Sequence, residues 1–231
     1  TGTISSAVSE LAIQNGVELT LLTRSGKGPE GAEQIACDIN DEDTAFSILK
    51  DRSFDVVADF VAFRPEQVER DIRLFQGKTE QYIFISSASA YQKPLVHPII
   101  TESTPLYNPY WQYSRDKIAC ETLLMAAYRS EGFPVTIVRP SHTYGDRSVP
   151  VSIHGANGSW QILARMLEGK PVIVHGDGLS LWTFTHNTDF AKGFWGLMGN
   201  PHAIGEAVHI TSDESLTWNA AFSAIGRALG V

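Results

Sequence analysis

The chain has 231 residues, of which 43% are hydrophobic and 19% are charged, and its formal net charge is −8. These values are ordinary for a folded globular protein, and the length allows one large domain or one domain with an additional lobe. A net charge this negative argues against nucleic acid or an anionic membrane as the main partner. We therefore expect a small-molecule substrate and no nucleic acid or membrane partner.

The cysteines and histidines give no metal-binding pattern. Cys37 and Cys120 are isolated from each other, and neither belongs to a Cys-x-x-Cys or other zinc spacing. The seven histidines are scattered along the chain. We expect no metal site, and the isolated thiols suit a reducing compartment, which predicts a cytoplasmic protein. The sequence contains no long apolar segment and no visible signal peptide.

The N-terminal segment is a loop that leads into a helical pattern over residues 7–14, which Gly16 is placed to end. Such a loop can bind phosphate through free amides and the helix dipole, and Gly2 lets the backbone approach closely. The alternative is an ordinary strand-to-helix turn, which a single glycine would favour. Because the chain opens within this loop, we expect a further strand before Thr1.

Residues 17–23 predict a buried strand, and Arg24 follows it directly. At this place in a doubly wound fold, an acidic residue binds the ribose hydroxyls of NAD. An arginine can instead pair with the 2′-phosphate of NADP, although a solvated loop cation is an equally good interpretation. Further strands are expected at 35–39 and 54–62, and Asn40 is expected to cap the helix that lies between them.

Helices and strands alternate along the rest of the chain. We expect helices at 65–75, from Tyr113 to about 128, and at 160–167, 189–198 and 217–229, with strands at 82–86, 135–140, 171–175, 183–185 and 207–210. This alternation predicts an α/β fold with a doubly wound, Rossmann-like parallel sheet. Residues 1–140 are expected to form a dinucleotide-binding domain. Residues 141–231 are expected to form a small C-terminal substrate-binding lobe that partly returns to the sheet.

Tyr113 and Lys117 are four residues apart on one predicted helix, so their side chains share a face. A nearby ammonium favours the phenolate, so we expect the pKa of Tyr113 to fall toward the range of a general acid or base. The alternative is a surface pair on an amphipathic helix, because so short a motif also arises by chance. Polar segments at 86–91 and 141–146 follow predicted strands, where parallel sheets bind ligands.

The order of these motifs resembles the extended short-chain dehydrogenases/reductases, also called NAD-dependent epimerases/dehydratases. The resemblance implies a catalytic serine, tyrosine and lysine, which are Ser87, Tyr113 and Lys117. The implied cofactor contacts are Gly2, Thr3, Ile4, Arg24, Asp38, Ile39, Phe60, Val61, Ala62, Tyr113, Lys117 and Pro140. The implied substrate contacts are Ser89, His142 and Trp182, although a lone histidine is more often structural.

Three positions depart from the family pattern. Ser5 and Val61 stand where the family usually has glycine and alanine, and Trp182 stands where nucleotide-sugar epimerases carry an arginine for the substrate diphosphate. An indole cannot pair with a diphosphate, which argues against a nucleotide-sugar substrate.

The resemblance implies an NAD(P)-dependent epimerase, dehydratase or reductase that acts on a hydroxyl or carbonyl of a small molecule, with sugars and sugar nucleotides among the candidates. NADP is slightly favoured over NAD by Arg24. The alternative is a member of the same fold that senses a dinucleotide or binds RNA without catalysis, because a fold does not fix a function. Relatives often form dimers, so a homodimer is a further expectation.

Overall fold

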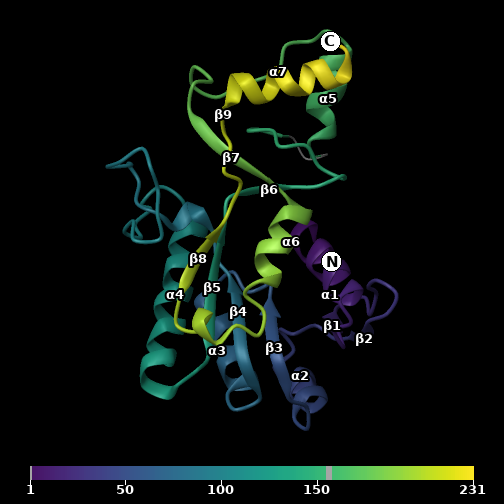
Figure 1. The fold of residues 1–231 in the computed structure, drawn as a ribbon, viewed down its shortest axis with the longest axis vertical. Coiled ribbons are helices and arrows are strands. Elements are labelled where there is room, and N and C mark those ends of the chain that lie inside the picture. Colours follow the sequence, from purple (N-terminus) through teal and green to yellow (C-terminus); the bar gives the residue numbers. More distant parts are fainter. Residues whose placement is uncertain (1, 155–157) are drawn as a thin grey trace.

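The computed structural model describes residues 2–154 and 158–231 (Figure 1). Its central element is a parallel sheet in the order β3 (Phe54–Asp59), β4 (Thr79–Ile85), β5 (Val135–Pro140) and β8 (Ala207–Ile210). The strand β8 lies beside β5, so the C-terminal part of the chain returns to this sheet. The long connections between parallel strands are the helices that cover its faces.

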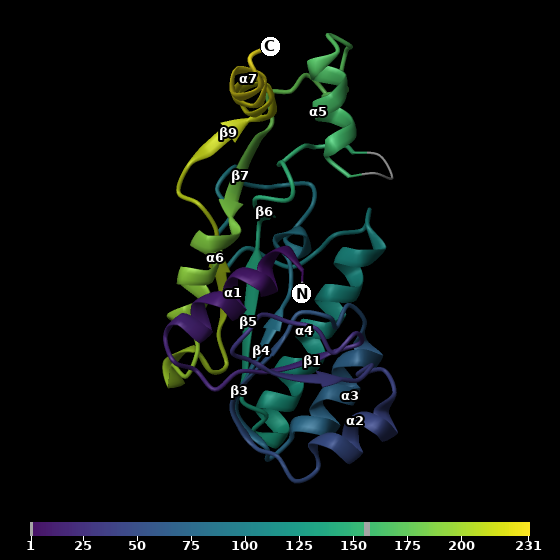
Figure 2. The same ribbon diagram turned by 90° about the vertical axis from the view of Figure 1, so that its right-hand side faces the viewer.

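Helices cover both faces of this sheet (Figure 2). The helices α3 (Pro65–Phe75) and α4 (Gln112–Glu131) pack on one face, together with α2 (Glu42–Leu49). The helices α1 (Thr3–Gln14) and α6 (Asn187–Trp195) pack on the other. Alternate residues of β4 supply both cores, because successive side chains of a strand point to opposite faces. This arrangement confirms the predicted doubly wound fold.

A second, two-stranded parallel sheet consists of β1 (Thr20–Thr23) and β2 (Glu33–Ala36). Within the described residues β1 pairs only with β2, and both β1 and β3 line a cavity. The strand was expected to be buried and to span 17–23. It spans Thr20–Thr23, and its residues are half-buried.

The C-terminal lobe lies at one end of the molecule, at the top of Figure 1. It contains a sheet of β6 (His142–Tyr144), β7 (Leu181–His186) and β9 (Ser215–Thr217), together with α5 (Trp160–Leu167) and α7 (Trp218–Leu229). Two predictions were wrong here. Residues 171–175 form no strand, and the segment expected to be only a polar loop contains β6.

Two short 3₁₀ turns, η1 (Ala88–Ala90) and η2 (Pro201–Ala203), complete the regular elements of the described residues. The predicted N-cap of α2 is displaced by one residue: Asp41 accepts the amide of Thr44 at 3.3 Å, whereas Asn40 accepts a hydrogen bond from Arg70. Among the described residues, no helix combines the length and apolar character needed to cross a membrane.

Candidate active site

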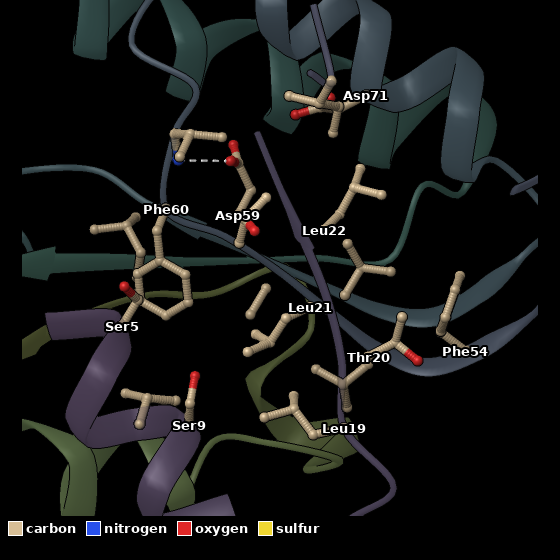
Figure 3. A pocket seen from close by; sticks show the side chains of 18 of the residues that line it. Ser5, Ser9, Leu19, Thr20, Leu21, Leu22, Phe54, Asp59, Phe60 and Asp71 are labelled. Atoms are coloured by element: carbon tan, nitrogen blue, oxygen red, sulfur yellow. Dashed lines mark hydrogen bonds between the residues drawn. The ribbon is translucent and has the colours of Figure 1, made fainter. Parts of the chain in front are cut away.

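A cavity is lined by the N-terminal residues of α1, by β1 and β3, and by residues at the carboxyl ends of β3, β4 and β5. Figure 3 shows Ser5 and Ser9 of α1, and Phe60 after β3, around it. The predicted site residues on its wall are Gly2, Thr3, Ile4, Arg24, Asp38, Ile39, Phe60, Val61, Ser87, Tyr113, Lys117 and Pro140. Thr1, the first residue of the expected phosphate loop, lies outside the described residues.

The N-terminus of α1 is suited to an anion. Gly2 is the N-cap, and the helix has no acidic side chain in its first turn. The first amides of a helix have no acceptor within the helix, and they coincide with the positive end of its dipole. Gly2 donates its own amide to the Ser5 hydroxyl at 2.8 Å, which orders the loop. This end of the cavity therefore fits the diphosphate of a dinucleotide.

Arg24 and Asp38 lie on the same wall of the cavity, after β1 and β2. The backbone amide and side chain of Asn40 donate to Asp38 at 3.0 and 2.9 Å. These bonds, together with the charge of Arg24, hold the pKa of Asp38 below its usual value. Arg24 itself is exposed, so its guanidinium is accessible to a ligand in the cavity.

Lys117 is 2% exposed at the wall of the cavity. Its ammonium donates to the carbonyls of Ala62 and Ile85, both at 2.6 Å, and lies 4.7 and 4.5 Å from the ring centroids of Phe63 and Phe84. Burial lowers the pKa of Lys117 to about 8. An ammonium has three N–H donors, so the two carbonyls leave one for a ligand.

The Tyr113 side chain lies close to Ser87. Burial raises the pKa of Tyr113, and the neighbouring Ser87 hydroxyl opposes that rise. The expected lowering by Lys117 was therefore wrong for this structure. The physical reason is that the ammonium is directed at two backbone carbonyls and lies 5.9 Å from the Tyr113 ring centroid.

A chain of hydroxyl groups orients Ser87. Its Oγ donates to the Ser89 hydroxyl at 2.9 Å, and Ser114 on α4 donates to the same Ser89 oxygen at 2.9 Å. Asn108 donates to the Ser89 carbonyl, also at 2.9 Å. Ser89, a predicted substrate contact, is not among the residues that line the cavity. It supports the serine that does.

The other predicted substrate contacts, His142 and Trp182, lie in the lobe and do not line the cavity. Their ring centroids are 5.9 and 5.8 Å from that of the buried Trp218. Burial lowers the pKa of His142. The contact with Trp218 gives His142 a structural place in the lobe. Trp182 remains 40% exposed.

Two aromatic residues that the sequence did not single out lie beside Tyr113. The Phe63 ring lies 6.3 Å from the Tyr113 ring, and the Trp111 ring lies 4.8 Å from it on the same helix end. The only signal for Trp111 is its place two residues before Tyr113. Phe63 follows the end of β3, and no local pattern indicates that it meets α4.

Residues 1–211 match the model of the NAD dependent epimerase/dehydratase family. The chain belongs to this family. It is similar to the chloroplast stem-loop binding protein of 41 kDa b of Arabidopsis thaliana, with 28% identity over 96% of this chain and 60% of that protein. It is also similar to 2′-dehydrokanamycin reductase of Streptomyces kanamyceticus, with 25% identity over 87% of this chain and 56% of that protein. The chain thus spans little more than half the length of these relatives.

Solved structures confirm the fold. An epimerase, Mth375, of Methanothermobacter thermautotrophicus matches with a TM-score of 0.83 and 17% identity, covering 99% of this chain and 74% of that one. The dTDP-glucose 4,6-dehydratase of Bacillus anthracis, solved in complex with NAD, matches with a TM-score of 0.82 and 20% identity, covering 99% and 78%. At these identities the likeness shows the fold alone.

Proposed function

We propose that this protein uses a nicotinamide dinucleotide to oxidise, reduce, epimerise or dehydrate a small molecule at a hydroxyl or carbonyl group. The observation that carries the proposal is that one cavity is lined by two kinds of group. These are the N-terminus of α1, which suits an anion, and the side chains of Ser87, Tyr113 and Lys117. Membership of the NAD dependent epimerase/dehydratase family supports the same conclusion.

Each of the three side chains has a role that its surroundings allow. The cofactor, when bound, supplies the hydride chemistry. Ser87 donates a hydrogen bond to the substrate oxygen, Tyr113 moves the proton on that oxygen, and Lys117 holds the nicotinamide ribose with its remaining N–H. The influence of Ser87 on the pKa of Tyr113 supports this assignment, because it means that the two hydroxyls lie close enough to act on the same substrate atom.

The residues that would hold the cofactor are the α1 amides at the diphosphate, Asp38 and Ile39 at the adenine end, and Phe60, Val61 and Pro140 along the cavity wall. Ala62 contributes through its carbonyl, which fixes Lys117. We further propose NADP rather than NAD, because the exposed Arg24 guanidinium supplies a positive charge where the 2′-phosphate of the adenosine ribose would lie.

The substrate that we propose is a small molecule without a diphosphate. Relatives include an enzyme named as a UDP-glucose epimerase, from Bacillus subtilis, and one named as 2′-dehydrokanamycin reductase, whose name contains no nucleotide. Trp182 replaces the arginine expected for a nucleotide sugar, and its exposed indole has no charge to offer a diphosphate. A polar, hydroxyl-bearing substrate of the second kind agrees better with this residue.

A second candidate function is RNA binding, which is favoured by one observation. The relative that covers 96% of this chain is named as a stem-loop binding protein. The net charge of −8 and the combination of Ser87, Tyr113 and Lys117 favour the enzyme. RNA affinity that falls steeply with salt, together with no binding of either dinucleotide, would reverse this ranking.

The cofactor proposal is tested by titrating NADPH and NADH against wild type and Arg24→Ala. We expect NADPH to bind more tightly than NADH, and the substitution to weaken NADPH by about tenfold, which corresponds to about 1.4 kcal/mol, while NADH is unaffected. Lys27→Ala, in the same loop, is the matched control. Equal affinity of the two cofactors for wild type would contradict the role of Arg24 and leave the nicotinamide site in place.

A further inference from the structure

Two buried carboxyl groups meet at one tyrosine next to the cavity. Tyr82 is fully buried, and its Oη lies 3.0 Å from Asp59 Oδ2 and 2.8 Å from Asp71 Oδ2. Figure 3 shows Asp59 and Asp71 at the same end of the pocket. The Nε of Arg70 donates to the other oxygen of Asp71 at 2.8 Å. None of these four groups has a role in the proposed reaction.

The proton arrangement of this cluster follows from its donors. Burial raises the pKa of Tyr82, so its hydroxyl keeps its proton, but one proton can serve only one carboxylate. Burial and the charge of Asp59 raise the pKa of Asp71. A proton on Asp71 lets Asp71 donate to Tyr82 and Tyr82 donate to Asp59.

Asp59 connects this cluster to the catalytic lysine. Its Oδ1 accepts the amides of Val61 and Ala62 at 2.8 and 3.1 Å, which fixes the turn after β3. The Ala62 carbonyl in that turn accepts a hydrogen bond from Lys117 at 2.6 Å. Hydrogen bonds therefore connect the Asp59 carboxylate to the backbone turn at Val61 and Ala62, and that turn to the Lys117 ammonium.

The charge of Asp59 also acts on Lys117 directly. It is the largest influence that opposes the effect of burial on the lysine, ahead of Cys120 and Glu121 on α4. Glu121 already forms an ion pair with Arg139, with N–O contact at 2.6 Å, and the Cys120 thiol is kept protonated by burial. Among the described residues, Asp59 is therefore the carboxylate that acts on Lys117 without an ion-pair partner of its own.

We propose that Asp59 is a positioning residue for Lys117: it fixes the Ala62 carbonyl that orients the ammonium, and its negative charge keeps that ammonium protonated. Tyr82 and Asp71 hold Asp59 in place. The proposal deepens the proposed function, because a charged, directed Lys117 is what would hold the nicotinamide ribose. Its test, however, measures the pKa of Lys117 directly and does not need turnover.

The test follows the NMR titration of lysine labelled with ¹³C at Cε, with the Lys117 signal assigned from its loss in Lys117→Met. Asp59→Asn keeps an oxygen for the two amides but removes the charge. We expect the pKa of Lys117 to fall by about 1 pH unit in this variant. Asp55→Asn, the same change at an exposed position of β3, is the matched control and should leave it unchanged.

The outcomes are distinct. A fall in Asp59→Asn alone supports the proposal, and Asp59→Glu, which retains the charge, should restore most of the wild-type value. No fall, or an equal fall in Asp55→Asn, overturns it. If Asp59→Asn does not fold, Asp59→Ser removes the same charge and gives the same measurement. Failure of wild type to bind NADH or NADPH would refute the proposed function while the lysine titration still decides the role of Asp59.

Discussion

At the scale of single residues, Lys117 combines burial with a task that needs its charge. The ammonium is stabilised by two carbonyls and by the faces of Phe63 and Phe84, yet burial lowers its pKa to about 8. Deprotonation removes both the charge and one N–H donor. Binding of a nicotinamide ribose at this residue should therefore depend on pH within an accessible range.

We predict that dinucleotide affinity is constant below this pKa and falls as the pH rises through about 8. Measuring the dissociation constant from pH 6.5 to pH 9.5, roughly 1.5 units on either side, checks this. Lys117→Arg is the control, because a guanidinium keeps its charge throughout that range and its affinity should not change with pH. An unchanged wild-type affinity up to pH 9.5 would show that the ammonium does not hold the cofactor.

At the scale of elements, α4 positions most of the site. It carries Tyr113, Ser114 and Lys117 on the side that faces β4 and the turn containing Ser87 and Ser89. The helix ends at Gly132, which has the left-handed conformation. One turn beyond Lys117, the Glu121 carboxylate accepts a hydrogen bond from the Ser86 hydroxyl and forms an ion pair with Arg139 of β5. Buried polar contacts thus connect the helix to β5 and to Ser86 after β4, one turn beyond Lys117.

Breaking this buried pair should destabilise the fold strongly. Arg139→Met leaves Glu121 buried without its cation, and we expect a loss of about 3–5 kcal/mol of unfolding free energy. Arg52→Met, which breaks the exposed Arg52–Glu33 pair, should change stability far less, because water screens that pair. Urea denaturation of both variants checks the prediction, and similar losses in the two would contradict it.

Elements with a strong local pattern were predictable from the sequence, whereas non-local pairing was not. Residues 65–75 form the predicted helix because Pro65 starts it and apolar residues recur at helical spacing. Residues 171–175 have strand-like composition, with Val172 and Val174 packed against the lobe core, but no strand pairs with them. The strand β6 was missed because its partner, β7, lies about forty residues later.

The same distinction applies to the site. The shared helix face of Tyr113 and Lys117 was predictable from their spacing, whereas Ser87 was singled out by the resemblance to the family. The influence of Asp59 on Lys117, and the contact of Phe63 with it, arise from tertiary packing that no spacing reveals. His142 and Trp182 were assigned to the substrate, yet they pack around Trp218 in the lobe.

At the scale of the whole molecule, residues of α1, β1, β3 and α4 line one cavity. Its lining residues are more than half the chain apart in sequence, from Gly2 to Pro140 and Thr143. A ligand that contacts both α1 and the residues Ser87, Tyr113 and Lys117 should present an anion near α1. A dinucleotide has such an anion, which makes its position in the cavity the central claim.

The most direct measurement is a crystal structure of the protein in complex with NADPH. We predict the diphosphate at the N-terminus of α1, the 2′-phosphate beside Arg24, and the nicotinamide ribose within hydrogen-bond distance of Lys117. The nicotinamide ring should lie beside Tyr113 and Ser87. A dinucleotide bound elsewhere, or bound in this cavity with its nicotinamide directed away from Tyr113, would contradict the account.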